Sequence, residues 1–144
     1  MNKLFSTTIN KQQLDIILLM LRVAVGAFML THGMGKFENL FSGEEIKFGD
    51  PIGLGTTTSL ALTLFAEFFC SILIVLGLAT RLAVIPLIIT MVTAAFVIHA
   101  THGFAKQEMA LLYLVVYVTL FVTGSGKYSL DWLMSRNTNR NLAV

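Results

Sequence analysis

The chain has 144 residues, the length of one domain, of which 56% are hydrophobic and only 12% are charged. Soluble domains usually carry about twice that charged fraction, so the composition argues against a soluble globule. The net charge of +2 and the lack of any Lys/Arg run give no sign of a nucleic-acid surface.

Four apolar stretches are long enough to cross a bilayer, for which a helix needs about 20 residues. In chain order the predicted spans cover residues 14–34, 57–79, 82–100 and 109–123. These runs are continuous rather than alternating, which excludes barrel strands. Residues 35–56 contain Gly, Pro and acidic side chains and are predicted to form an outer loop. The sequence therefore predicts one all-α domain over residues 1–144, an integral membrane four-helix bundle.

Lys and Arg in the short flanks predict the orientation of the bundle, because cytoplasmic flanks carry more of them. One side holds six such residues and the other holds three: Lys3, Lys11, Arg81, Lys127, Arg136 and Arg140 against Lys36, Lys47 and Lys106. We therefore expect both termini in the cytoplasm. The first ten residues are polar and the first span contains Arg22, so we expect no cleaved signal peptide.

One basic and one acidic residue interrupt the spans, Arg22 in the first and Glu67 in the second. A lone charge in hydrocarbon costs roughly 3 kcal/mol on insertion scales. Counted from the ends of their spans at Leu14 and Ala79, the two residues lie roughly 12 Å and roughly 18 Å from the inner side. Because an Arg side chain is long, we predict that they pair near the membrane centre. Such a pair can be a packing staple or part of a ligand site.

Helix phase places further candidate residues near this pair. Four of them share one face of the first span: Arg22, Gly26, Gly33 and Lys36. The two glycines permit a neighbouring helix or a ligand to approach the backbone. Five ionisable side chains are predicted to converge at the outer mouth: His32, Lys36, His99, His102 and Glu108. The plainer interpretation is that interfacial histidines and snorkelling lysines, Lys106 included, sit among headgroups.

Metal and haem sites have weaker support in the sequence. Cys70 is the single cysteine, which excludes an intrachain disulfide, a CxxC redox pair and a thiolate metal or iron–sulfur site. A b-type haem between His32 and a histidine of the third span is an alternative, but His32 lies about 80° from the Arg22 face. A metal at His99, His102 and Glu108 would need its third ligand from across a loop. We expect neither a metal nor a haem.

Several short motifs occur at informative places. They are Leu21-Arg22-Val23 with Gly26, then His32-Gly33-Met34-Gly35-Lys36-Phe37, Glu67, Gly77-Leu78-Ala79-Thr80-Arg81-Leu82, and the ending Gly124 to Asp131. In combination, over about residues 15 to 131, the chain resembles the DoxX family of small four-helix bacterial membrane proteins. The resemblance implies a multi-pass protein of the bacterial inner (cytoplasmic) membrane. It matches the polar positions of the family at Arg22, Lys36, Glu67 and Arg81, and it implies no catalytic residues.

Relatives in that family are linked to quinone chemistry and oxidative stress, so the resemblance implies an oxidoreductase-associated protein that handles a quinone or similar small molecule. Arg22 would polarise a quinone carbonyl and Glu67 would relay a proton. The outer residues His99, His102 or Glu108 would connect the site to water. The sequence has no flavin, haem or iron–sulfur motif, so electrons would come from a soluble or membrane partner subunit.

Two other functions stay open at this point. The alternative to a quinone site is a non-catalytic membrane scaffold or assembly subunit for a peripheral redox enzyme, to which a basic tail would be suited. Whether the chain is an enzyme, as a membrane subunit of a quinone-linked oxidoreductase, is left open. A channel is disfavoured because four helices seldom leave a pore. The oligomeric state is also open, and a homo-oligomer is one option.

Overall fold

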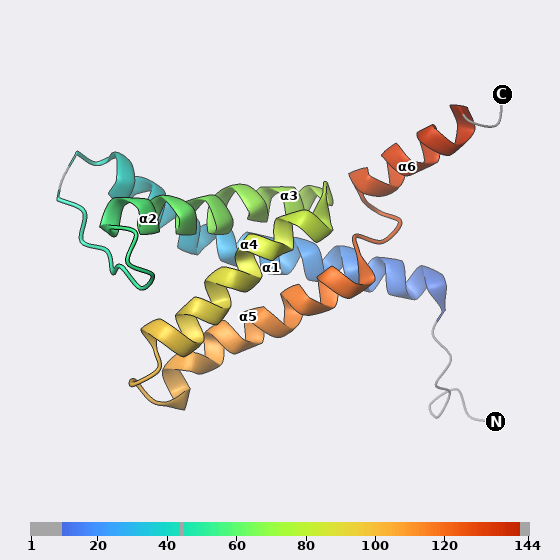
Figure 1. The fold of residues 1–144 in the computed structure, drawn as a ribbon. Coiled ribbons are helices and arrows are strands. Elements are labelled where there is room, and N and C mark those ends of the chain that lie inside the picture. Colours follow the sequence, from blue (N-terminus) through green and yellow to red (C-terminus); the bar gives the residue numbers. More distant parts are fainter. Residues whose placement is uncertain (1–9, 44, 142–144) are drawn as a thin grey trace.

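The computed structural model describes residues 10–43 and 45–141, with side chains as far as Arg136. Four helical rods are long and apolar enough to cross a membrane. They are α1 (Lys11–Phe41), the continuous rod of α2 (Thr56–Leu64), η2 (Phe65–Cys70) and α3 (Ser71–Leu76), the rod of α4 (Thr80–Thr93) and η3 (Ala94–Ile98), and α5 (Phe104–Thr123). A further helix, α6 (Leu130–Asn141), follows them (Figure 1). The described residues form no strand, and the predicted all-α membrane bundle is confirmed.

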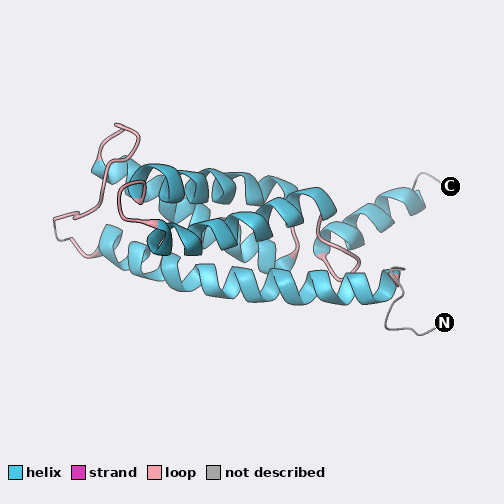
Figure 2. Ribbon diagram, turned by 90° about the horizontal axis from the view of Figure 1, so that it is seen from below, coloured by secondary structure: helices cyan, strands magenta, loops and turns pink. Residues whose placement is uncertain are grey.

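The rods pack side by side, and the start of α1 and the whole of α6 lie at the same end (Figures 1 and 2). We call this the terminal end. The opposite end carries loop 42–55 and the connection 99–103, and we call it the loop end. The cytoplasmic location of the terminal end stays a prediction. Of the basic residues that support it, Lys3 and the side chain of Arg140 lie outside the described part of the chain.

The first span is longer than predicted, and the predicted loop 35–56 is wrong at its start. Residues 35–41 form the last turns of α1. The ring of Phe37 stacks on that of Phe68 in the second rod, with centroids 5.5 Å apart, and lies 4.7 Å from the ring of Phe41. Aromatic packing therefore continues a helix through a stretch whose polar composition is typical of a loop.

Two glycines bring α1 against the second rod. A Cβ at Gly26 would lie 2.5 Å from a methyl carbon of Val75, and one at Gly33 would lie 3.0 Å from the backbone of Glu67. Small residues at such contacts let helices approach closely in lipid, where apolar burial drives little association. The second rod, one of the two neighbours that these glycines were expected to permit, packs against both of them, and Gly33 lies level with Glu67. Their role in a ligand pocket stays a prediction.

The C-terminal segment is tied to the turn between the second and third rods. Gly77 ends α3 in the left-handed conformation, with φ at 68°, and Ala79 follows with φ at 47°. The Asp131 carboxylate accepts hydrogen bonds from the backbone N–H groups of Ala79, at 2.6 Å, and Thr80, at 3.1 Å. The N–H of Asp131 donates in return to the carbonyl of Gly77 at 2.9 Å. Asp131 thus caps the start of α4 from 51 residues away.

Candidate functional site

A cavity of about 420 Å³ lies near the loop end, between α1, η2, the third rod and α5. Its volume falls in the range of about 300–1,000 Å³ typical of small-molecule sites. Apolar side chains form part of its wall: Met29, Met91, Ala94, Ala105, Met109 and Ala110. Polar and ionisable side chains form the rest: His32, Glu67, His99, Lys106 and Tyr113. An apolar wall with a few convergent polar groups is typical of a binding site.

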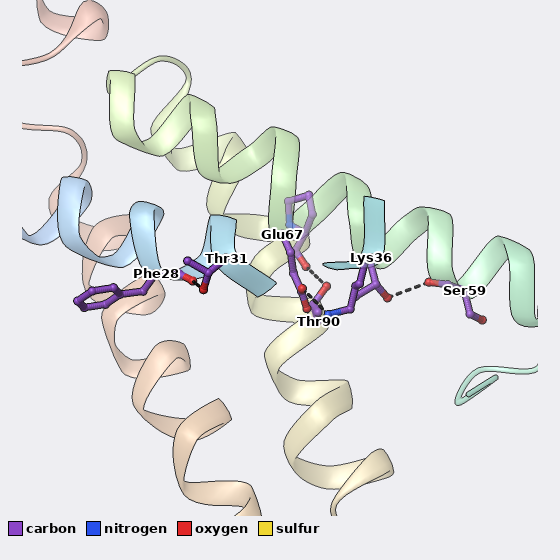
Figure 3. A network of polar contacts seen from close by, with 8 residues as sticks. Phe28, Thr31, Lys36, Ser59, Glu67 and Thr90 are labelled. Atoms are coloured by element: carbon purple, nitrogen blue, oxygen red, sulfur yellow. Dashed lines mark hydrogen bonds and ion pairs between the residues drawn. The ribbon is translucent and has the colours of Figure 1, made fainter. Parts of the chain in front are cut away.

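Glu67 is the acidic residue of this cavity, and its partner is Lys36. Lys36 reaches across from α1, and its Nζ donates to Glu67 Oε2 at 2.6 Å (Figure 3). The Glu67 side chain is 7% exposed and that of Lys36 is 23% exposed. This is the only ion pair among the residues that the structure describes. Lys36 therefore neutralises a carboxylate that would otherwise be buried alone.

The predicted pairing of Arg22 with Glu67 is wrong. Arg22 is fully buried and donates to two backbone carbonyls, that of Ile74 at 3.2 Å and that of Tyr128 at 2.5 Å. Ile74 lies seven residues beyond Glu67, about 10 Å along the helix. The prediction assumed that both spans end at one plane, whereas α1 extends beyond the end of α3 (Figure 1). Arg22 consequently lies in the terminal half and does not line the cavity.

The structure brings together part of the predicted outer cluster. His32 and His99 line the cavity with Glu67. His102 lies next to His99, with ring centroids 5.6 Å apart in an edge-on contact, but does not line it. Glu108 is exposed on α5 and does not line it either.

One tyrosine and one lysine that line the cavity, Tyr113 and Lys106, were missed as site residues. Tyr113 lines the cavity, and its ring lies 6.1 Å from His32, edge-on, and 6.1 Å from Tyr117, stacked. Tyr117, one turn further along α5, is fully buried, and its hydroxyl has no hydrogen-bond partner among the described residues. Lys106, expected only as an anchor, also lines the cavity. The one-turn spacing of the tyrosines, with Lys106 two turns before Tyr113, was the available signal, because such residues share a helix face.

Comparison with known proteins agrees with these motifs. The DoxX family model matches residues 17–100, more than half of the chain. The chain belongs to the DoxX family. Over 118 residues this DoxX protein is 29% identical to "Putative oxidoreductase CatD" of Bacillus subtilis (strain 168), a match that covers 81% of this chain and 86% of the relative. No solved structure matches it. Together with the four apolar rods, the family supports a multi-pass membrane protein.

Two π-helical turns flank the cavity of this DoxX protein. Glu67 lies within η2, and His99 directly follows η3, where its N–H bonds to the carbonyl of Ala94 five residues earlier, at 2.9 Å. Such turns are rare inside helices and are frequent at functional sites. Nothing in the sequence pattern indicated either of them. Their presence beside the polar wall supports a site here rather than a packing defect.

The alternative of a metal held by His99, His102 and Glu108 is not supported by the structure of this DoxX protein. Within the described part of the chain, no three His, Cys, Asp or Glu side chains come close enough together to hold a metal ion. His99 and His102 are neighbours, but Glu108 does not complete a set with them. The chemistry of the cavity is therefore that of hydrogen-bond donors, one carboxylate and imidazoles.

Proposed function

We propose that this DoxX protein is an oxidoreductase-associated protein of the bacterial inner membrane that binds a quinone or a similar small carbonyl compound in the loop-end cavity. The observation that carries the proposal is the mixed wall of that cavity, in which methionines and alanines lie together with hydrogen-bond donors. The methionines suit an apolar ring. The donors suit its carbonyl oxygens.

The polar side chains match what quinone reduction requires. Conversion of a quinone to a quinol takes up two electrons and two protons, one proton on each carbonyl oxygen. The Tyr113 hydroxyl and the Lys106 ammonium can donate hydrogen bonds to those oxygens, and His32 and His99 can deliver protons from the water at the loop end. In this proposal the two electrons come from a partner oxidoreductase.

The Lys36–Glu67 ion pair holds two opposite charges in a fixed position at the cavity wall. Lys36 is partly exposed and Glu67 is nearly buried, so the pair connects the cavity wall with the loop-end surface. Intramembrane charges that meet inside a bundle commonly mark a ligand or proton path. With both termini in the cytoplasm, this surface would face the outer side of the membrane.

Binding of a short-chain quinone to the protein in nanodiscs tests the proposal. Decylubiquinone and menadione are titrated by calorimetry into the wild type and into Tyr113→Phe, which removes one donor and keeps the ring. Because a neutral hydrogen bond contributes about 1 kcal/mol, we expect about five-fold weaker binding. Tyr128→Phe, at the terminal end, is the matched control and should bind as the wild type does.

The outcomes separate the two functions. Saturable binding that weakens in Tyr113→Phe and in His99→Gln, but not in the control, supports the quinone site. Absence of saturable binding, or binding that ignores both cavity variants, overturns it. If the cavity variants also recover an associated redox enzyme from membranes as well as the wild type does, the scaffold function becomes the better account.

A further inference from the structure

A second and larger hollow, of about 1,130 Å³, lies at the terminal end of the bundle. It is bounded by the first turns of α1, the start of α4, segment 123–128 and the start of α6. None of its lining residues lines the loop-end cavity. We call it the terminal hollow, and its chemistry differs from that of the proposed quinone site.

Three cations line the terminal hollow: Lys11, Arg81 and Lys127. Within the described residues none of them lies within 4.0 Å of a carboxylate oxygen. Arg81 Nη2 donates to the carbonyl of Val122 at 3.2 Å, which fixes the guanidinium at the rim without neutralising its charge. Among the described residues, the hollow therefore holds three cations against two carboxylates, Asp15 and Asp131, with no ion pair between them.

The two carboxylates of the hollow accept hydrogen bonds from backbone N–H groups in its wall. Asp15 accepts a hydrogen bond from the N–H of Lys127 at 3.0 Å, and Asp131 caps the start of α4. Asp131 also interacts electrostatically with the buried Arg22 behind it. The Thr80 hydroxyl oxygen, beside Asp131, is buried and has no hydrogen-bond partner among the described residues.

We infer the level of the membrane surface at this hollow from Trp132. It is the single tryptophan of the chain and lines the hollow from α6. Its ring lies 5.7 Å from Lys127 Nζ and 5.4 Å from Arg136 Cζ, so two cations flank it. Trp is enriched at the boundary between lipid and water. The cations around it consequently lie at the depth of lipid headgroups.

The hollow leads into a surface stripe that faces the acyl chains. Leu82, in its wall, is 70% exposed, and Ile85 and Ile89 continue the same face of α4 toward the membrane interior. Val122 on α5, whose carbonyl holds Arg81, is also exposed. A ligand that fills the hollow therefore has apolar protein surface directly below its polar part.

We propose that the terminal hollow binds an anionic phospholipid, with its phosphate between Arg81 and Lys127 and its acyl chains along the Leu82 stripe. A soluble phosphate would meet the same cations but would gain nothing from the stripe. A zwitterionic lipid would meet the stripe but would carry a compensating ammonium into a positive hollow. Only an anionic amphiphile satisfies both halves of the surface.

Trp132 fluorescence provides the test, because no other tryptophan contributes to the signal. The full-length protein is placed in phosphatidylcholine nanodiscs, and phosphatidylglycerol brominated high on its acyl chains is added in increasing fraction. Bromine quenches a nearby indole, so the lipid fraction at half-maximal quenching measures lipid preference. Brominated phosphatidylcholine gives the zwitterionic reference, and inorganic phosphate tests the soluble anion.

The double variant Arg81→Gln/Lys127→Gln should bind the anionic lipid about 30-fold more weakly, because each cation near an anionic surface contributes about five-fold. Lys47→Gln removes a cation at the loop end, outside both sites, and should quench as the wild type does. Unfolding temperatures of both variants show whether the fold is retained. Equal quenching by the two lipids, no change in the terminal-end variant, or reversal by inorganic phosphate at physiological concentration would each overturn the proposal.

Discussion

Lys36→Met should destabilise the bundle more than Glu67→Gln does, although the two changes break the same ion pair. Lys36→Met leaves a carboxylate that is 7% exposed and has no other hydrogen-bond donor among the described residues. Removing one partner of a buried pair costs about 3–5 kcal/mol, and the partial exposure of this pair favours the lower figure. Glu67→Gln leaves a lysine that can extend to water, so we expect a cost of about 1–2 kcal/mol.

The double variant tests whether the pair acts as a unit. At 2.6 Å and an effective dielectric constant of about 20, the Coulomb attraction is about 6 kcal/mol, and desolvation offsets more than half of it. We therefore expect Lys36→Met/Glu67→Gln to cost about 2 kcal/mol and the coupling energy to be about 2–3 kcal/mol. Denaturant unfolding in bicelles, followed by circular dichroism, measures all four corners of the cycle.

A second cycle distinguishes this pair from the one expected from the sequence. Arg22→Gln should destabilise by about 2–3 kcal/mol through its two lost bonds to carbonyls. Combined with Glu67→Gln its effect should be additive within about 0.5 kcal/mol, because the two side chains have separate partners. Coupling between Arg22 and Glu67 as large as that between Lys36 and Glu67 would refute the observed pairing.

Three further predictions concern other parts of the fold. Gly33→Ala should lower stability by about 1–3 kcal/mol, because its Cβ would lie 3.0 Å from the backbone of Glu67. Gly35→Ala has open space and should raise stability by up to about 1 kcal/mol, and thermal unfolding compares the two. Hydrogen bonds from a serine hydroxyl and from backbone N–H groups lower the pKa of Asp50 from its ordinary value of 3.8. The stabilisation that ionised Asp50 gives to the loop is therefore present above the ordinary pKa of 3.8 and is lost as the pH falls through the lowered pKa. NMR shifts of the loop amides should consequently change only below about pH 4. Tyr117→Phe removes a buried hydroxyl without a partner, so the unfolding temperature should stay level or rise, and a loss above about 1 kcal/mol would reveal a hidden partner.

Composition and periodicity were enough to predict the fold class and the contact face of α1. Long apolar runs predict helices in a bilayer because no other open structure satisfies the backbone there. The glycines on the Arg22 face, Gly26 and Gly33, both lie against the second rod, which is one of the two neighbours that their phase was expected to permit. These properties depend on residues close together in one helix, where the geometry is fixed at 100° per residue.

The partners of the buried charges could not be predicted in the same way. They depend on how far one helix is shifted along its neighbour. Because hydropathy is nearly constant along an apolar span, it does not distinguish one shift from another. The stagger of α1 moves Arg22 beside Ile74 and Lys36 beside Glu67. The contacts that set this stagger are between backbone and glycine, and leave no charge or polarity pattern to detect. The π-helical turn that contains Glu67 was invisible for a similar reason, because it is one additional residue in an apolar run.

The stagger also divides the charged residues between two sites with different chemistry. Arg22 donates a hydrogen bond to the carbonyl of Tyr128, close to Asp131, which caps α4. It thereby holds part of the wall of the terminal hollow in place. Glu67, with Lys36, belongs to the loop-end cavity, at least two helical turns away along the second rod. The two charges that the sequence places in adjacent spans therefore serve opposite ends of the bundle. Because neither shares a partner with the other, a change of lipid at the terminal hollow can reach the cavity only through movement of the rods themselves.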